Sequence, residues 1–155
     1  MTVSIYSRER MEKRLSEGAL ERTAVISFSD PVERAKKYRP EYLPIDYSGR
    51  CERVMQIALH DLDPDVLGEV GLTVESFFPE ACELAAFIKS AVADGLDIVC
   101  QCEYGQSRSA GCAAAILQYY EGRGIDIFAD YRYYPNQLVY HKVFDALTAE
   151  SGGSE

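Results

Sequence analysis

The residues best suited to chemistry in this sequence lie in one short stretch near the middle of the chain. Five residues separate Cys102 from Arg108, with Gly105 between them and Ser109 directly after the arginine. A thiolate is a strong nucleophile, and the planar guanidinium of arginine binds two oxygens of a phosphate at once. These residue types at this spacing predict chemistry on a phosphate group.

The surrounding stretch, 97–120, contains the elements needed to position these side chains. It predicts a short β-branched strand at 98–100, a tight loop, and a helix over 108–120 that is apolar nearly all round. A loop between a strand and a helix can turn successive backbone N–H groups inward, forming a nest for an anion at the helix N-terminus. The same dipoles, together with Arg108, favour the thiolate form of Cys102 near neutral pH.

The motif resembles that of the cysteine-based protein tyrosine phosphatases, most closely the small dual-specificity type. Their motif reads His-Cys, two residues, Gly, two residues, Arg, then Ser or Thr. The corresponding residues here are Gln101, Cys102, Glu103, Tyr104, Gly105, Gln106, Ser107, Arg108 and Ser109. The resemblance implies a phosphatase that hydrolyses phosphotyrosine or related phosphate monoesters through a phospho-cysteine intermediate.

The resemblance also assigns roles. It implies that Cys102 is the nucleophile, that residues 103–108 bind the phosphoryl group with Arg108 as its clamp, and that the Ser109 hydroxyl helps the thiolate leave. One residue departs from the motif, because Gln101 replaces the histidine that helps to keep the cysteine ionised.

Hydrolysis of a phosphate ester needs a proton for the leaving oxygen, usually from a carboxylic acid. In the family this acid is an aspartate on a mobile loop a few tens of residues before the cysteine. Asp61, directly after an apolar strand, is the first candidate; Asp63 is the second and Asp65 a weaker third. Alternatively, all three only form turns. His60 and Asp30 are interpreted as structural.

The rest of the sequence predicts a single α/β domain, with a central, mostly parallel sheet flanked by helices in three layers. Residues 1–150 are expected to form the domain and 151–155 a flexible tail. Pro64 and Gly68 are expected to break the structure, and 32–50 is expected to be a surface loop with one helical turn, either functional or covering a sheet edge. The predicted strands are 3–6, 23–28, 53–59 and 98–100; the predicted helices are 8–17, 79–93, 108–120, 125–131 and one that begins at 136 with Asn136 as its N-cap.

In such sheets, ligands bind beyond the carboxyl ends of the strands. The end of the strand at 53–59 and the end of the strand at 98–100 are therefore expected to be neighbours. One would carry the acid and the other the nucleophile.

Composition narrows the function further. The net charge is −9, which argues against nucleic acid or an anionic membrane as a partner. The chain has five cysteines, an odd number, and its sequence shows no secretory signal. The protein is therefore expected to be cytoplasmic, with its cysteines reduced. No metal site or other cofactor is expected. Because the loop has no lysine, polyanionic substrates are disfavoured, and a phosphorylated protein or a small phosphomonoester is favoured.

Two other classes of function compete with a phosphatase. The first is a catalytically weak phosphate-binding module, which is suggested by Gln101 in place of the motif's histidine. The second is a sulfur-transfer or arsenate-reducing enzyme, which also uses a cysteine in an anion loop. Sulfurtransferase loops have a different spacing, and the arsenate reductases with the same spacing carry it near their N-terminus, so position 102 disfavours both.

Overall fold

The computed structural model describes residues 1–149. Its centre is a sheet of four strands, all parallel, in the order β1-β4-β2-β3. The strands are β1 (Val3–Tyr6), β2 (Leu20–Ser29), β3 (Cys51–Ala58) and β4 (Asp97–Gln101). The predicted α/β fold is confirmed, and the described part of the sheet is entirely parallel.

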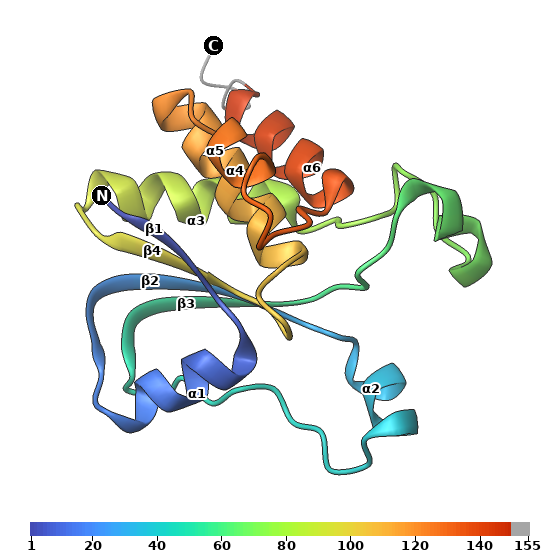
Figure 1. The fold of residues 1–155 in the computed structure, drawn as a ribbon, viewed down its shortest axis with the longest axis horizontal. Helices are drawn as coiled ribbons and strands as arrows, with labels where there is room; N and C mark the ends of the chain where they lie inside the picture. The colour runs from blue at the N-terminus through green and yellow to red at the C-terminus, as the bar shows by residue number, and fades with distance from the viewer. Residues whose placement is uncertain (150–155) are drawn as a thin grey trace.

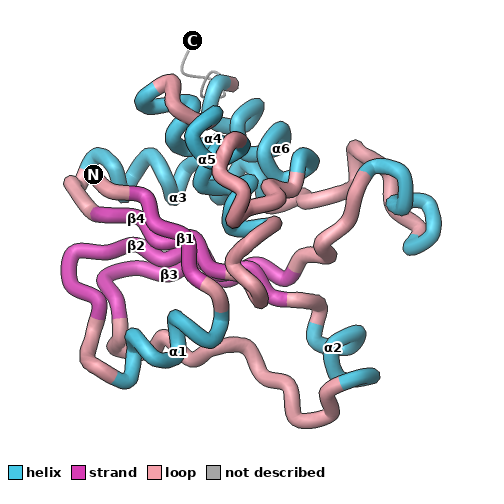
Figure 2. Tube along the Cα trace, viewed as in Figure 1, coloured by secondary structure: helices cyan, strands magenta, loops and turns pink. Residues whose placement is uncertain are grey.

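Helices cover both faces of this sheet, which makes three layers (Figure 1). One face carries most of the helices, and the other is covered by α1 together with the connection between α2 and β3 (Figure 2). The helices are α1 (Arg8–Ser16), α2 (Val32–Tyr38), the 3₁₀ helix η1 (Pro64–Val70), α3 (Ala81–Ala93), α4 (Arg108–Glu121), α5 (Ile125–Phe128) and α6 (Gln137–Thr148).

The alternation of side chains along the strands divides the core into two parts. Ile98 and Cys100 of β4 pack into the larger cluster, which lies under α3, α4 and α6. Val99, between them, packs on the opposite face with Met11 and Leu15 of α1. Successive residues of a strand point to opposite faces, so Gln101 points to the α1 side and Cys102 to the α4 side.

Helix α4 is the buried centre of the larger layer, as its all-round apolar pattern predicts. It lies so close to α6 that a Cβ atom on Gly111 would come within 2.5 Å of the Asn136 carbonyl oxygen. The helix ends at Gly122, whose left-handed conformation gives the predicted C-cap. This packing fixes the N-terminus of α4, and with it the loop that begins at Cys102.

Several predicted boundaries differ from the structure. The segment with Pro64 and Gly68 was expected to be broken but forms η1, because proline is compatible with the first turn of a helix. Strand β2 is longer than predicted at both ends, and α3 begins at Ala81 rather than at Pro79. Helix α5 ends at Phe128 instead of residue 131.

The long connection between α2 and β3 is more buried than a surface loop. Tyr42, Ile45 and Tyr47 are all buried, and the Gln56 side chain of β3 donates a hydrogen bond to the Ile45 carbonyl at 2.8 Å. The segment therefore covers a face of the sheet beside α1 rather than its edge. The predicted tail, 151–155, lies outside the described residues.

Within residues 1–149, no helix is long and apolar enough to cross a membrane.

Candidate active site

The loop between β4 and α4, residues 102–108, is called the candidate phosphate loop below. Four of its carbonyl oxygens are bonded to groups outside the loop: the Cys102 carbonyl accepts from the Gln101 side chain at 2.9 Å and the Glu103 carbonyl from Arg8 N at 3.0 Å. The Gln106 carbonyl accepts from Tyr134 N at 2.8 Å, and the Ser107 carbonyl accepts from Asn136 N at 3.0 Å and from Gly111 N at 2.8 Å.

These bonds set the direction of the loop's N–H groups. In a trans peptide the N–H points opposite to the C=O, and the described chain contains no cis peptide bond. The N–H groups of residues 103, 104, 107 and 108 therefore point away from the partners of the carbonyls. None of the N–H groups of residues 103–108 donates to a carbonyl within residues 1–149. The loop thus has the predicted form of an anion nest.

Gly105 is required for the shape of this loop. Its φ is +67°, in the left-handed region that favours glycine, and a Cβ atom there would lie 2.6 Å from the backbone nitrogen of Ser7. The loop is therefore pressed against the start of α1. A side chain at position 105 would push the two apart.

Cys102 begins the loop and is 2% exposed. Its Sγ atom lies 3.1 Å from the hydroxyl oxygen of Ser109, which is fully buried in the first turn of α4. A hydroxyl at this distance is able to donate a hydrogen bond to a thiolate. Ser109 and Cys102 are therefore within hydrogen-bond distance of each other.

Arg108 closes the loop and is equally buried. Its Nη1 atom donates to the Leu59 carbonyl at 2.7 Å and to an Asp30 carboxylate oxygen at 2.9 Å. Its Nε atom is buried and has no hydrogen-bond partner within residues 1–149. A buried, unpaired N–H is costly, so a guanidinium bonded on one side and unpaired on the other is suited to binding an anion.

Asp61 reaches the same loop from the other direction. One of its carboxylate oxygens accepts from the Ser107 hydroxyl at 2.6 Å and from the Asn136 amide at 2.9 Å. The Asn136 amide also donates to the Leu62 carbonyl at 3.1 Å and caps α6, since its oxygen accepts from Val139 N at 2.9 Å. Strands β3 and β4 are not neighbours as expected, because β2 lies between them, but Asp61 and the candidate phosphate loop do meet at the expected edge of the sheet.

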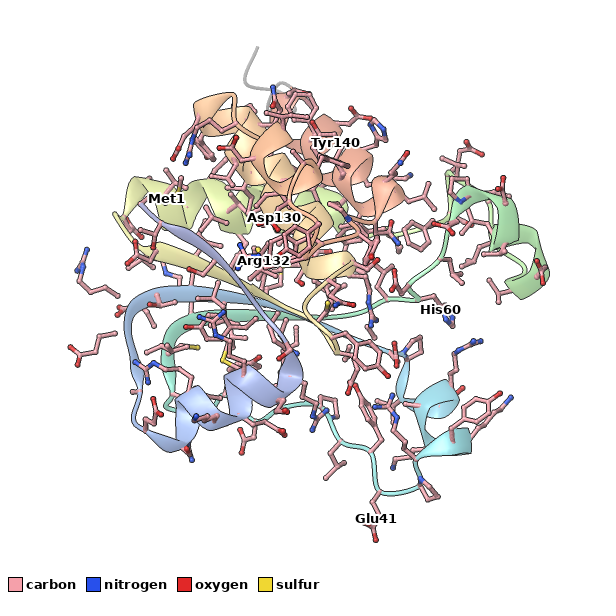
Figure 3. The ribbon with its side chains drawn as sticks, in the orientation of Figure 1. Met1, Glu41, His60, Asp130, Arg132 and Tyr140 are labelled. Carbon is pink, nitrogen blue, oxygen red and sulfur yellow. The ribbon has the colours of Figure 1, made fainter. Side chains whose placement is uncertain are left out.

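The other candidates for the acid do not reach the loop through such contacts. Asp63 is the N-cap residue of η1, and Asp65 lies in the first turn of that helix. His60 lies between the end of β3 and α2 (Figure 3), where burial and the nearby Arg34 lower its pKa. Within the described residues, only Asp61 of the three aspartates is hydrogen-bonded to the loop.

Comparison with solved structures gives this fold relatives. The structure of Tk-PTP in the active form has a TM-score of 0.56 at 15% identity, covering 95% of this chain and 91% of its own. Human DUSP28 has a TM-score of 0.54 at 16% identity, covering 94% and 90%. A human tyrosine phosphatase-like serine/threonine/tyrosine-interacting protein has 0.54 at 16% identity, covering 90% and 83%.

The chain has the fold of the small dual-specificity phosphatases. By sequence alone, no protein-family model matches it, and no curated protein matches it either. The evidence for the phosphatase fold therefore comes from the structure comparison, and the motif at 101–109 agrees with it.

Two residues around the site of this phosphatase fold were not predicted to be there. The sequence indicates only a structural role for Asp30, but it directly follows β2 and its carboxylate bridges Arg108 and Arg39, each at 2.9 Å. The rule that ligands bind at the carboxyl ends of parallel strands applies to β2 as well and would have found it. Asn136 was predicted only as a helix cap, and nothing in the sequence signals its bond to Asp61.

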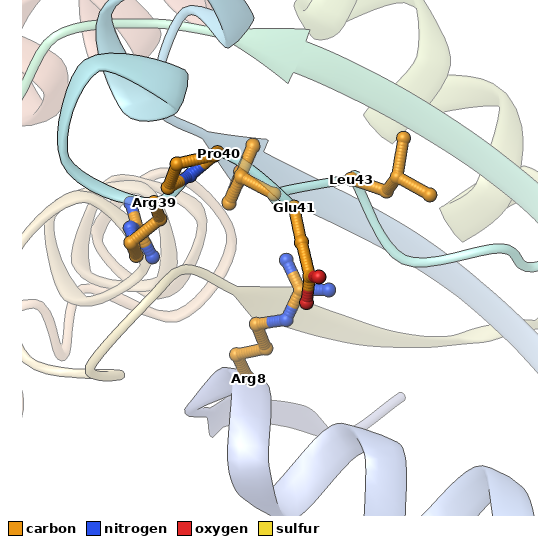
Figure 4. Close-up of a pocket in the computed structure, with 6 residues that line it drawn as sticks. Arg8, Arg39, Pro40, Glu41 and Leu43 are labelled. Atoms are coloured by element: carbon orange, nitrogen blue, oxygen red, sulfur yellow. The ribbon is translucent and has the colours of Figure 1, made fainter.

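Arg39 joins the loop to a neighbouring pocket. Its Nη1 atom lies 3.3 Å from a carboxylate oxygen of Glu103, so one of the expected substrate-binding side chains is held in an ion pair. The guanidiniums of Arg39 and Arg8 both lie over the Tyr42 ring, at 4.6 and 5.3 Å from its centre. They line a pocket of about 510 Å³ beside the loop (Figure 4).

The remaining loop side chains and the nearby thiols complete the site. Tyr104 and Gln106 are exposed at the surface of the loop. Cys100 shares the core cluster of Cys102 and is fully buried. Contact with the Cys112 thiol, together with burial, raises the pKa of Cys100 well above its usual value. Cys100 is therefore a poor nucleophile compared with an activated thiol.

Proposed function

We propose that this protein is a cysteine-dependent phosphatase of the tyrosine or dual-specificity type. Cys102 attacks phosphorus, the ester P–O bond breaks, and the leaving oxygen takes a proton from Asp61. Water then hydrolyses the phospho-cysteine, which releases inorganic phosphate and returns the thiolate, with the Ser109 hydroxyl hydrogen-bonded to the departing sulfur. Arg108 and the N–H groups of the loop bind the phosphoryl oxygens throughout.

One observation carries this proposal: at the start of α4, several hydrogen-bond donors have no acceptor within residues 1–149. The N–H groups of residues 103–108 have no carbonyl partner within residues 1–149, and the buried Nε of Arg108 has no partner there either. Donors without acceptors, at the N-terminus of a helix, favour a ligand that brings several oxygen atoms and negative charge. A phosphoryl group meets both requirements, and the Cys102 sulfur begins the same loop.

Asp61 is proposed as the acid because two donors, Ser107 and Asn136, hold its carboxyl group beside the loop. Asp63 and Asp65 have no comparable contact within the described residues. The substrate is proposed to be a phosphorylated tyrosine, serine or threonine side chain, or a small monoester. The loop has no lysine, and its Glu103 is paired with Arg39, so it carries little excess positive charge for a polyanion.

A phosphate-binding module with weak catalysis is the second candidate. Two observations favour it: Gln101 stands at the position of the motif's histidine, and one structure of the same fold is named phosphatase-like. Both candidates bind an oxyanion at the loop. They differ in whether the Cys102 thiolate catalyses repeated turnover of a substrate.

The test is a turnover assay of the wild-type protein with p-nitrophenyl phosphate and with a phosphotyrosine peptide, beside Cys102→Ser. Steady release of phosphate by the wild type, loss of release in the variant, and a phosphorylated Cys102 peptide after acid quench are expected. Tungstate binding without turnover would favour the binding module. Turnover of thiosulfate or arsenate instead would overturn both.

A further inference from the structure

Gln101, which departs from the motif, belongs to a buried hydrogen-bonded cluster that spans three parts of the chain. Ser27 of β2 and Gln101 of β4 are register partners on adjacent strands, and the Ser27 hydroxyl donates to the Gln101 side-chain oxygen. The Tyr47 hydroxyl, from the connection between α2 and β3, lies 2.8 Å from that oxygen and 3.1 Å from the Ser27 hydroxyl. All three residues are at most 4% exposed.

The chemistry of the partners fixes which way the Gln101 amide points. The Cys102 carbonyl can only accept, so the amide nitrogen must face it, as it does at 2.9 Å. The amide oxygen must then face the two hydroxyls, and both are able to donate to it. Donation to the oxygen polarises the amide and strengthens the bond from its nitrogen. The cluster is therefore a directed chain of hydrogen bonds that ends on the carbonyl of Cys102.

That carbonyl is one of the four that hold the candidate phosphate loop. The bond from Gln101 keeps the Cys102–Glu103 peptide turned so that the Glu103 N–H points away from Gln101, into the nest. Without the bond, the buried carbonyl would lack a partner, and the peptide would gain by rotating toward another donor. Rotation would remove an N–H group from beside the thiolate.

We propose that Gln101 is a positioning residue for the loop, held in place by Ser27 and Tyr47, and that it replaces a titrating histidine by a neutral donor. This inference rests on the proposed function and adds to it. It also gives the connection over 39–50 a role at the active site, because Tyr47 closes the cluster from that connection. The thiolate is then favoured by oriented dipoles and by Arg108, with no second ionisation from position 101.

The ionisable groups around the cluster do not replace it. Cys51, Arg8 and Glu12 are near enough to Tyr47 to act on its pKa electrostatically. On the other side of the strand, Cys100 faces Cys102, and Asp30 faces Arg108. Apart from Tyr47, none of these side chains donates to or accepts from the Gln101 side chain within residues 1–149. Burial raises the pKa of Tyr47 to about 12, so its hydroxyl remains a donor at every pH of the experiment.

The test measures the pH midpoint of iodoacetamide alkylation at Cys102, read by peptide mass, and the Kd of tungstate by calorimetry. Gln101→Met keeps the size but removes the donor. Gln101→Glu also keeps the size, but its carboxylate cannot donate and adds negative charge near the thiolate. The midpoint is expected to rise in both, by about one unit or more in Gln101→Glu, which corresponds to about tenfold less thiolate at low pH. Tungstate binding should weaken in parallel.

Tyr47→Phe keeps the packing and removes one hydroxyl, so it tests the cluster without risk to the fold. The pH midpoint of Cys102 alkylation in this variant is expected to rise by a few tenths of a unit, which corresponds to about twofold less thiolate at low pH. Tyr42→Phe, from the same connection, is the matched control and should leave the midpoint unchanged, since within the described residues the Gln101 side chain bonds to Ser27, Tyr47 and the Cys102 carbonyl and not to Tyr42. Gln101→His returns a donor and is expected to restore the midpoint while adding a second ionisation step.

Wild-type midpoints in both Gln101→Met and Tyr47→Phe would overturn the positioning role, whatever the turnover. A wild-type protein that fails to hydrolyse p-nitrophenyl phosphate, while the midpoints shift as expected, would overturn the proposed function alone.

Discussion

In the candidate phosphate loop, Cys102 and Arg108 are 2% and 3% exposed, and four carbonyls are bonded to groups outside the loop. The segment that carries Asp61 is different. Asp61, Asp63 and Asp65 are all exposed, and the chain between β3 and α3 contains only the 3₁₀ helix η1. Two loop side chains contact this segment: the Ser107 hydroxyl donates to Asp61, and the Arg108 guanidinium donates to the Leu59 carbonyl.

This difference in burial and hydrogen bonding corresponds to two roles in the proposed reaction. Binding a phosphoryl group needs donors that are oriented before the substrate arrives, and burial with many backbone bonds provides that orientation. Donating a proton needs one acidic group at the right place, and a few hydrogen bonds are enough to hold it. Changes in the loop should therefore affect every substrate, whereas changes at Asp61 should depend on how much the leaving group needs a proton.

The largest effect is expected from Cys102→Ser. A serine hydroxyl is a far weaker nucleophile than a thiolate, so turnover of every substrate should fall below detection. The nest and Arg108 remain, so tungstate should still bind at the loop. Phosphate release and tungstate affinity are measured on the same preparation. Undiminished turnover in the serine variant would contradict the mechanism.

Asp61→Asn should separate the two segments by substrate. With phenyl or alkyl esters, the loss of a positioned acid is expected to slow turnover about 10²–10⁴-fold. With p-nitrophenyl phosphate the loss should be much smaller, because nitrophenolate leaves without a proton. The alkaline limb of the rate-versus-pH profile should disappear, and the acid limb should remain.

Asp63→Asn is the matched control for this change. It lies two residues further along the same exposed segment and has no bond to the loop within the described residues, so its kinetics should resemble the wild type. If Asp63→Asn shows the dependence on the leaving group and Asp61→Asn does not, the acid is misassigned. If neither shows it, the proton comes from another residue.

Arg108→Lys should affect all substrates alike. A single ammonium cannot donate in one plane to two phosphoryl oxygens and also keep the bonds to Asp30 and Leu59. Loss of such a donor typically costs about 10²–10³-fold in kcat. Steady-state kinetics with phenyl phosphate and p-nitrophenyl phosphate should give the same loss for both. A near-normal rate would mean that Arg108 serves only the fold.

The same contrast explains what the sequence predicts and what it does not. The candidate phosphate loop is local, with nucleophile, glycine and arginine inside seven residues, and the strand before it and the helix after it have clear patterns. The sequence also predicts Asp61 as the acid, because it comes directly after a strand whose end lies at the ligand-binding edge of the sheet. It leaves Asp61 as the first of three candidate aspartates.

Other parts of the site depend on contacts that are distant in sequence. Asn136 is bonded to a residue 75 positions away, and Tyr47 to one 54 positions away. Asn136 also caps a helix, which by itself explains an asparagine there. Tyr47 lies in a connection rich in proline and charge, which favours a surface loop, although its aromatic residues cover the sheet. Pro64 and Gly68 mark the end of regular α and β structure, but they do not exclude a 3₁₀ helix.

The smallest effect is expected at the contact between Ser107 and Asp61. Ser107→Ala removes one of the two donors to Asp61 and leaves the Asn136 amide on the same oxygen. A hydrogen bond of this kind contributes about 1 kcal/mol, which predicts a loss of about fivefold with phenyl phosphate and little or none with p-nitrophenyl phosphate. In the Asp61→Asn background, Ser107→Ala should add nothing, because its effect passes through the carboxyl group. An equal loss in both backgrounds would mean that Ser107 acts on the phosphoryl group directly, and that the loop and the Asp61 segment are independent.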